Sequence, residues 1–219
     1  MQRAFGLDIP QTLEDVCDPA SLALIVYDMQ VGIVKQIANG REITERVLQV
    51  LGACRAAGVR VIFTRHMSLP TELMGAFQFR TAMAWQRVKT PQEVNSWFLR
   101  DTPGFDLVPE LKPLPSEAIF DKITMSAFEG TPLDIALRDC AIRAFAIVGI
   151  AMEIGIEPTA RHGADLGYIP VVIKDACGFG HREAAERSIA GLEFAGDSLL
   201  TTVNTFCAQL GAKRPAAVK

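Results

Sequence analysis

The feature that most constrains the fold is a regular alternation of apolar, strand-like runs with helix-like segments along most of this 219-residue chain. Strands that are apolar along their whole length are typical of a parallel sheet covered on both faces. We expect strands at 21–29, 59–66, 117–122, 144–150, 169–176 and 198–203. We expect helices at 42–57, where Gly58 marks the end, and at 131–140, 157–167, 181–196 and 204–210. This order predicts an α/β fold: a three-layer, doubly wound, Rossmann-like domain with a mainly parallel six-stranded sheet and helices on both faces.

Residues 67–115 break this pattern. They contain both tryptophans and six of the prolines, together with several Phe and Met residues. This composition favours short helices and loops laid over a site rather than another strand–helix unit. We therefore expect one domain over 1–212, with 67–115 as a lid or insert, and a flexible tail at 213–219.

Composition and charge exclude several classes of function. The net charge is −3, and Lys and Arg are scattered, so nothing favours nucleic acid as a partner. No apolar run is long enough to cross a bilayer, and the N-terminus lacks the pattern of a signal peptide. The five cysteines form no CxxC pair, which favours reduced thiols in a cytoplasmic protein over disulfides or structural zinc.

Candidate site residues follow from the strand order, because ligands of open parallel sheets bind beyond the carboxyl ends of the strands. These positions are Asp28, Arg65, His66, Lys122, the turn at 150–157, and Asp175 to Cys177. A carboxylate such as Asp28 at a strand end either caps a turn or acts as an acid or base. Lys122 is either a surface lysine or the partner that holds that carboxylate ionised or exchanges a proton with it.

Two of the candidates have a plainer reading. His66 has no companion histidine or cysteine at metal-ligand spacing, so a metal site is not expected there. Cys177 is the only thiol expected at a carboxyl strand end, where it is either a small buried apolar residue or a nucleophile. No cofactor is expected either. "GIAMEIG" lacks the order of a dinucleotide motif, and "SAFEGT" lacks the ending of a P-loop.

Several segments together resemble the isochorismatase-like superfamily, often called the cysteine hydrolases. They are "LIVYDMQ", "FTRH", "KITMSAFEGTPLDIALRDC", "IVGIAMEIGIEPTARHGADLGY" and "VVIKDACG", in that order. The resemblance covers most of the chain outside 67–115 and implies the isochorismatase-like α/β fold. It also implies that Asp28 and Lys122 match two members of the Asp–Lys–Cys site of the family's amidases. The nucleophile position falls on Gly155, which has no side chain to form a thioester.

Family members with glycine at this position resemble isochorismatase itself, which cleaves a vinyl ether with the Asp as acid and no covalent intermediate. The resemblance then implies that Gly155 leaves room for a substrate ring or a water. It further implies a non-proline cis peptide near Ile150–Ala151 and backbone donors for a substrate oxyanion. The substrate and oxyanion residues expected on this basis are Arg65, His66, Ile150, Ala151, Met152, Ile154 and Gly155.

The leading hypothesis is a small-molecule hydrolase without a cysteine nucleophile, which uses acid–base chemistry of Asp28 and Lys122. Arg80 or Arg87 can bind a substrate carboxylate, and Glu153 can contact the substrate. One alternative is an amide or imide hydrolase whose Cys at 155 was replaced, in nature or by engineering, with water or Cys177 taking over. Another is a ligand-binding pseudoenzyme. The resemblance also implies a homodimer or homotetramer, in which the apolar 67–100 segment can meet a partner subunit.

Overall fold

The computed structural model describes residues 1–212, and within them it contains a six-stranded sheet whose neighbouring strands all run parallel. The strands are β3 (Leu22–Tyr27), β4 (Arg60–His66), β5 (Ala118–Lys122), β6 (Ala144–Ile150), β7 (Ile169–Gly178) and β8 (Leu199–Thr201). The helices that pack on the sheet are α3 (Gly40–Ala57), α5 (Leu133–Asp139), α6 (Glu157–Asp165), α7 (Arg182–Ala195) and α8 (Val203–Ala212). The sheet, these helices and the short segments that join them are called the body below. The tail expected at 213–219 lies outside the described residues.

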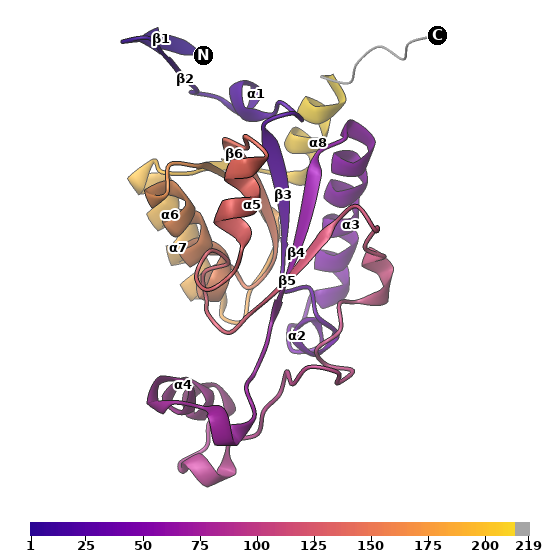
Figure 1. Cartoon of the computed structure of the whole chain (residues 1–219), viewed down its shortest axis with the longest axis vertical. Coiled ribbons are helices and arrows are strands. Elements are labelled where there is room, and N and C mark those ends of the chain that lie inside the picture. The colour runs from indigo at the N-terminus through magenta and orange to yellow at the C-terminus, as the bar shows by residue number, and fades with distance from the viewer. Residues whose placement is uncertain (213–219) are drawn as a thin grey trace.

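The strand order is β5-β4-β3-β6-β7-β8. The chain therefore builds outward from β3 to one edge, and then returns to the other side of β3 and builds outward again. Helices α3 and α8 cover one face of the sheet, whereas α5, α6 and α7 cover the other (Figure 1). The predicted three-layer, doubly wound fold is confirmed, and the point where the strand order reverses lies between β3 and β6.

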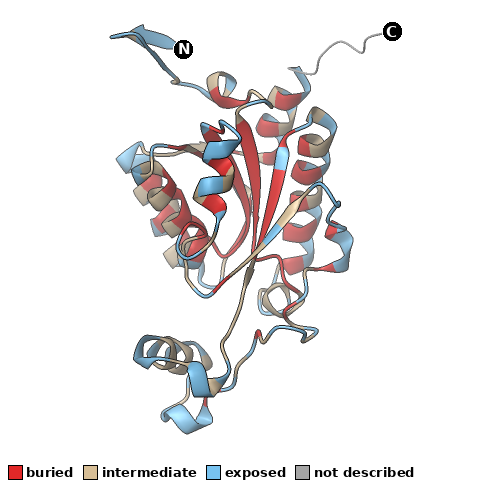
Figure 2. Ribbon diagram, viewed as in Figure 1, coloured by how far each residue is buried: buried red, intermediate tan, exposed pale blue. Residues whose placement is uncertain are grey.

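Alternate residues of β3 supply two separate cores, because successive side chains of a strand point to opposite faces. Leu22, Leu24 and Val26 join the core under α3 and α8. Ala23, Ile25 and Tyr27 join the core under α5, α6 and α7. Burying one such aliphatic side chain contributes about 1.5–3 kcal/mol. Figure 2 shows these central strands as the most deeply buried part of the molecule.

Helix α3 ends where the sequence predicts. Gly58 has a φ of 75°, and its N–H donates to the carbonyls of Arg55 and Cys54. A residue with a Cβ adopts this left-handed conformation only at a cost, so glycine is the residue expected at a helix end of this kind. The chain can then turn directly into β4.

The segment expected as a lid over 67–115 divides into two parts in the structure. Residues 67–103, called the lid below, contain α4 (Ala76–Gln86) and short 3-10 helices at Thr71–Leu73 and Pro91–Glu93. The lid extends from the carboxyl end of the sheet (Figure 1), and none of the residues of α4 is buried. Residues 104–111 instead belong to the body. They include the buried Phe105 and Leu111 and form backbone hydrogen bonds with Met29–Gly32.

Residues on either side of β3 form short elements that the sequence pattern did not indicate. A hairpin of β1 (Gln2–Ala4) and β2 (Leu7–Ile9) precedes α1 (Leu13–Val16), and α2 (Val31–Val34) follows β3. Phe5 at the hairpin tip is fully exposed. In a strand of only three residues, the alternation of apolar and polar side chains is too short to distinguish the strand from a loop.

Within residues 1–212, no helix is both long enough and apolar enough to span a membrane.

Candidate active site

The reversal of strand order brings two sequence-predicted segments together. Asp28 follows β3 directly, and the turn that begins at Ala151 follows β6 directly. The two strands are paired in register from Leu22↔Ala144 to Tyr27↔Gly149. Asp28 and Ala151, which are 123 positions apart in sequence, thus reach the same end of the sheet, where ligands of doubly wound folds bind.

Asp28 is fixed by the end of the neighbouring strand β4. Its backbone has a φ of 46°, and its N–H donates to both the carbonyl and the hydroxyl of Thr64, each at 3.2 Å. The Thr64 hydroxyl donates in turn to Asp28 Oδ1 at 2.6 Å. Only 3% of Asp28 is exposed, so this carboxylate depends on protein groups rather than on water for its hydrogen bonds.

Lys122, at the end of β5, is paired with Asp28 as predicted. Its Nζ lies 2.6 Å from Asp28 Oδ2, 2.8 Å from Tyr27 Oη and 3.1 Å from the Thr124 carbonyl. Burial lowers the pKa of the Lys122 ammonium, and the Asp28 carboxylate opposes that shift. The outcome is a buried ion pair whose proton is held less firmly by the lysine than it would be in water.

The turn after β6 contains the cis peptide between Ile150 and Ala151 that the family resemblance implies. Residues 152–156 then form a π-helical turn before α6. The Ala151 carbonyl accepts hydrogen bonds from the N–H groups of Ile154, Gly155 and Ile156 at 3.0–3.3 Å. Of the oxyanion donors expected here, Ile154 and Gly155 are therefore engaged within the turn, and Met152 is buried beneath it.

The expectation that Gly155 leaves room for a ring or a water is wrong. A Cβ added at Gly155 would lie less than 3.0 Å from three atoms of Tyr27: Oη, Cζ and Cε1. Real Cβ atoms almost never come this close to another heavy atom. The Tyr27 side chain thus fills the space beside Gly155. Its role was missed because a tyrosine at the end of an apolar strand looks like an ordinary core residue.

His66 and Arg65 are adjacent in sequence but differ in placement. His66 lines the cavity beside Asp28, and burial, with a smaller effect of the Lys122 ammonium, lowers the pKa of His66 to about 4. Arg65 instead forms an ion pair with Asp121 at 2.8 Å and lies over the Phe105 ring. Arg65 is therefore not among the residues that line the cavity.

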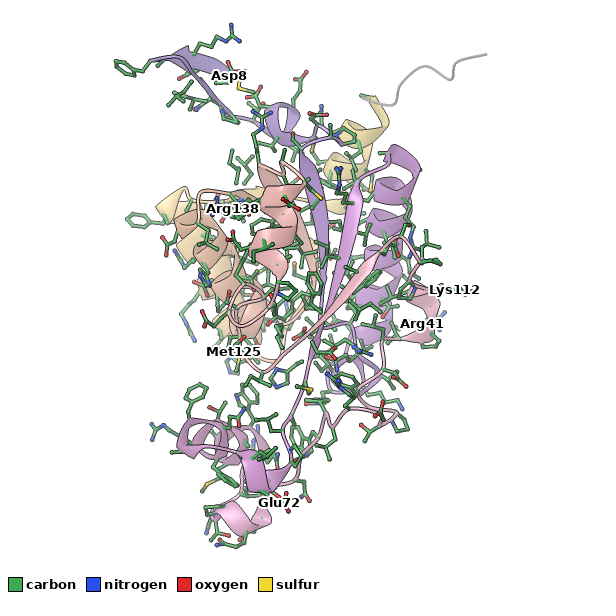
Figure 3. The ribbon with its side chains drawn as sticks, in the orientation of Figure 1. Asp8, Arg41, Glu72, Lys112, Met125 and Arg138 are labelled. Atoms are coloured by element: carbon green, nitrogen blue, oxygen red, sulfur yellow. The ribbon has the colours of Figure 1, made fainter. Side chains whose placement is uncertain are left out.

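A cavity of about 430 Å³ opens above the Asp28–Lys122 pair. This volume is within the usual range for small-molecule sites. Asp28, Tyr27, His66, Ile150, Ala151 and Ile154 line it from the body. Trp85, Arg87, Trp97 and Phe98 line it from the lid, and Met125 lies at the end of the body that faces the lid (Figure 3). Arg80 is exposed on α4 and does not line the cavity.

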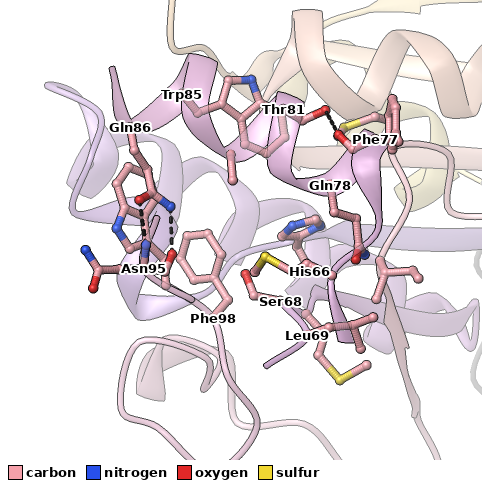
Figure 4. A pocket seen from close by; sticks show the side chains of 16 residues that line it. His66, Ser68, Leu69, Phe77, Gln78, Thr81, Trp85, Gln86, Asn95 and Phe98 are labelled. Carbon is pink, nitrogen blue, oxygen red and sulfur yellow. Dashed lines mark hydrogen bonds between the residues drawn. The ribbon is translucent and has the colours of Figure 1, made fainter. Parts of the chain in front are cut away.

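A smaller cavity of about 60 Å³ lies beside the first, beneath α4. His66, Trp85 and Phe98 border both cavities, and Figure 4 shows these rings around the smaller one. The end of α4 is held to the following segment by a pair of hydrogen bonds between Gln86 and Asn95 at 2.7 and 2.9 Å. The lid thus supplies aromatic walls, whereas the body supplies the carboxylate and the ammonium.

Several candidates have structural roles. Cys177 is buried, its thiol donates to the Ile173 carbonyl at 3.2 Å, and burial raises its pKa. Asp175 accepts from the Val203 N–H at the start of α8. Glu153 accepts from the N–H groups of Gly180 and His181, so it holds a neighbouring loop. In residues 1–212 we find no group of three or more His, Cys, Asp or Glu side chains that could bind a metal.

Gln30 is a second residue whose role the sequence did not indicate. It is fully buried, accepts from the His66 N–H at 2.6 Å, and donates to the carbonyls of His66 and Phe105. One side chain therefore ties together the end of β4 and the segment that follows the lid. The "DMQ" sequence carries this residue, but only the structure identifies its partners.

Solved structures similar to the chain share its fold. A cysteine hydrolase from Pseudomonas syringae is 22% identical, with 89% of this chain and 94% of that chain covered and a TM-score of 0.76. An isochorismatase family protein from Burkholderia thailandensis is 26% identical, covering 88% and 96% with a TM-score of 0.71. The nicotinamidase from Bacillus subtilis is 19% identical, covering 83% and 99% with a TM-score of 0.68.

The isochorismatase domain model matches residues 22–204. This match begins with β3, ends just beyond β8, and contains Asp28, Lys122 and Gly155. The chain therefore belongs to the isochorismatase family, whose members include hydrolases.

Proposed function

We propose that this protein is a small-molecule hydrolase that works without a cysteine nucleophile, with Asp28 as acid and base and Lys122 as its electrostatic partner. The observation that carries the proposal is the buried 2.6 Å pair between these residues at the floor of a 430 Å³ cavity. Among the described residues that line this cavity there is no cysteine. Asp28 is the carboxylate among them, which makes it the group best placed to move a proton.

The pair supports cleavage of an enol ether. Asp28 takes a proton from Lys122, whose pKa burial lowers, and delivers it to the enol carbon of the substrate. A C–H bond forms there while the π electrons leave an oxocarbenium ion at the ether carbon. Water adds to that carbon, the hemiketal breaks its C–O bond to give a ketone and an alcohol, and the proton from water returns to the pair.

The cavity walls indicate the kind of substrate. Trp85, Trp97 and Phe98 offer aromatic surface, and Arg87 is the cationic side chain of the lid that borders the cavity. A flat or cyclic molecule with an anionic group fits walls of this chemistry, because the ring packs on aromatics and the anion meets a guanidinium.

The test is a hydrolysis screen over vinyl ethers, amides and esters that carry a ring and a carboxylate. Asp28→Asn should lower turnover of every active substrate by roughly 10²–10⁴-fold, the usual contribution of a positioned acid or base. Asp101→Asn, on the exposed surface of the lid, should leave turnover unchanged.

Equal turnover by Asp28→Asn and the wild type would exclude the acid–base role. Hydrolysis confined to amides would favour the amidase alternative. A ligand that raises the melting temperature without any hydrolysis would favour a pseudoenzyme.

A further inference from the structure

The side chain of Tyr27 stands in the space that any side chain at position 155 would need. Three atoms of its phenol ring lie inside the 3.0 Å limit around a Cβ built on Gly155. The nearest of them is the hydroxyl oxygen, and the other two belong to the ring. Position 155 therefore accepts only glycine while Tyr27 keeps this rotamer.

Tyr27 is held in this rotamer from several sides. Its backbone pairs with Gly149 across β3 and β6, and only 2% of the residue is exposed. Its hydroxyl donates to the Met125 carbonyl and accepts from Lys122 Nζ at 2.8 Å. The ring is also packed in the core under α5, α6 and α7. A clash at Gly155 thus cannot be relieved by swinging a loose side chain into solvent.

The Tyr27 hydroxyl also completes the coordination of Lys122. An ammonium group has three N–H donors. They have three acceptors within hydrogen-bond distance: Asp28 Oδ2, Tyr27 Oη and the Thr124 carbonyl. With all three donors engaged, Lys122 acts on a substrate only through Asp28.

We propose that Tyr27 and Gly155 form an interlocked pair that replaces a nucleophile. Tyr27 closes position 155 to any side chain and positions Lys122 against Asp28, which commits the site to chemistry without a covalent enzyme intermediate. Tyr27 is in this sense a positioning residue. The positioning half of the proposal rests on the proposed function, whereas the steric half does not.

The steric half is tested by melting temperature in a double-mutant cycle. Gly155→Ala should lower the melting temperature by roughly 4–10 °C, as expected for overpacking in a domain of this size. In the Tyr27→Ile background the same change should cost less than about 2 °C, because the shorter side chain vacates the space.

Gly52→Ala is the matched control. Gly52 lies within α3, and no heavy atom would come within 4 Å of its added Cβ, so the melting temperature should not fall. An equal cost of Gly155→Ala in both backgrounds would overturn the steric interlock.

The same interlock predicts how a thiol can be introduced. Gly155→Cys alone should lower the melting temperature as Gly155→Ala does, and its new thiol should gain no amidase activity. In the Tyr27→Ile background, Gly155→Cys should cost less than about 2 °C, and its thiol should be modified by iodoacetamide, as read from the peptide mass. Full stability of the single variant, with a reactive thiol at 155, would contradict the proposal.

The positioning half is tested with Tyr27→Phe, which keeps the ring over Gly155 and removes one acceptor of Lys122. On a substrate found in the hydrolysis screen, kcat should fall roughly 10-fold with little change in KM. The melting temperature should fall by a few degrees, because a Lys122 donor and the Met125 carbonyl each lose a partner. Tyr168→Phe is the control, because the Tyr168 hydroxyl bonds to Asp134 and does not line the cavity.

An unchanged kcat for Tyr27→Phe would overturn the positioning role. If no substrate is hydrolysed by the wild type, the proposed function fails, and with it the positioning role. The melting-temperature cycle still decides the steric interlock by itself.

Discussion

The two regions that enclose the cavity are built in opposite ways. On the body side, Asp28 and Lys122 are each 3% exposed, and their charged atoms are paired with protein groups. On the lid side, α4 has no buried residue, and Phe77 is 67% exposed. The difference indicates separate roles for the two regions. The sheet fixes the positions of the reacting groups, and the loosely packed lid determines which molecules reach them.

The contribution of the body to stability can be tested by removing the Lys122 ammonium. Lys122→Met would leave the buried Asp28 carboxylate without its partner, so we expect the free energy of unfolding to fall by about 3–5 kcal/mol. Urea denaturation measures this loss. Adding Asp28→Asn should restore a large part of it, because the unpaired charge is then gone.

Lys89→Met provides the matched comparison on the lid. Lys89 is exposed, and its replacement should change the free energy of unfolding by less than about 0.5 kcal/mol. A similar loss for Lys122→Met and Lys89→Met would show that the two regions do not differ as described.

The boundary between the regions can be examined through His66. Its pKa in the folded protein is lowered to about 4, so the unfolded chain binds a proton that the folded chain does not as pH falls below about 6.5. The stabilisation from neutral His66 is therefore complete above pH 6.5 and is lost toward pH 4. The free energy of unfolding of the wild type, relative to His66→Phe, should decrease by about 3 kcal/mol over this interval.

NMR titration of the His66 imidazole tests the same point directly. A midpoint near 4 is expected in the folded protein. A midpoint near the value of an exposed histidine would mean that the lid does not shield this side chain from water.

The role of the lid in substrate binding can be tested with Arg87. Arg87→Met should raise KM for carboxylate-bearing substrates by roughly 10–100-fold with little effect on kcat, because a charge-assisted hydrogen bond is lost from binding alone. Its melting temperature should stay at the wild-type value, since Arg87 is exposed. Arg80→Met, on the same helix but away from the cavity, is the control in steady-state kinetics. Equal KM values for the two variants would show that Arg87 does not contribute to substrate binding.

Local signals in the sequence predicted the body well. The β6 strand spans the predicted residues 144–150, because a run of β-branched and apolar residues is bounded by clear breaks. Asp28 and Lys122 could be identified because each polar residue ends an apolar strand. Their proximity is explained by the strand order, since β3 and β5 lie on either side of β4 in the sheet.

The contacts that could not be predicted depend on packing between distant segments. Tyr27 over Gly155 requires the register between β3 and β6 and the path of the π-helical turn. The sequence predicts that Glu153 can contact the substrate, but its carboxylate accepts hydrogen bonds from amides 27 and 28 residues further along. The internal arrangement of the lid was also beyond sequence reasoning, because α4 shows no clear apolar stripe for the body to bury.

The Gln30 side chain has a mechanical consequence. It bonds to His66, the last residue before the lid, and to Phe105, which follows shortly after the lid ends. Both ends of the lid are thereby anchored to one buried amide on the body. A larger ligand must then be accommodated by bending within 67–103, while the floor of the cavity keeps its geometry, so the same reacting groups can serve lids of very different sequence.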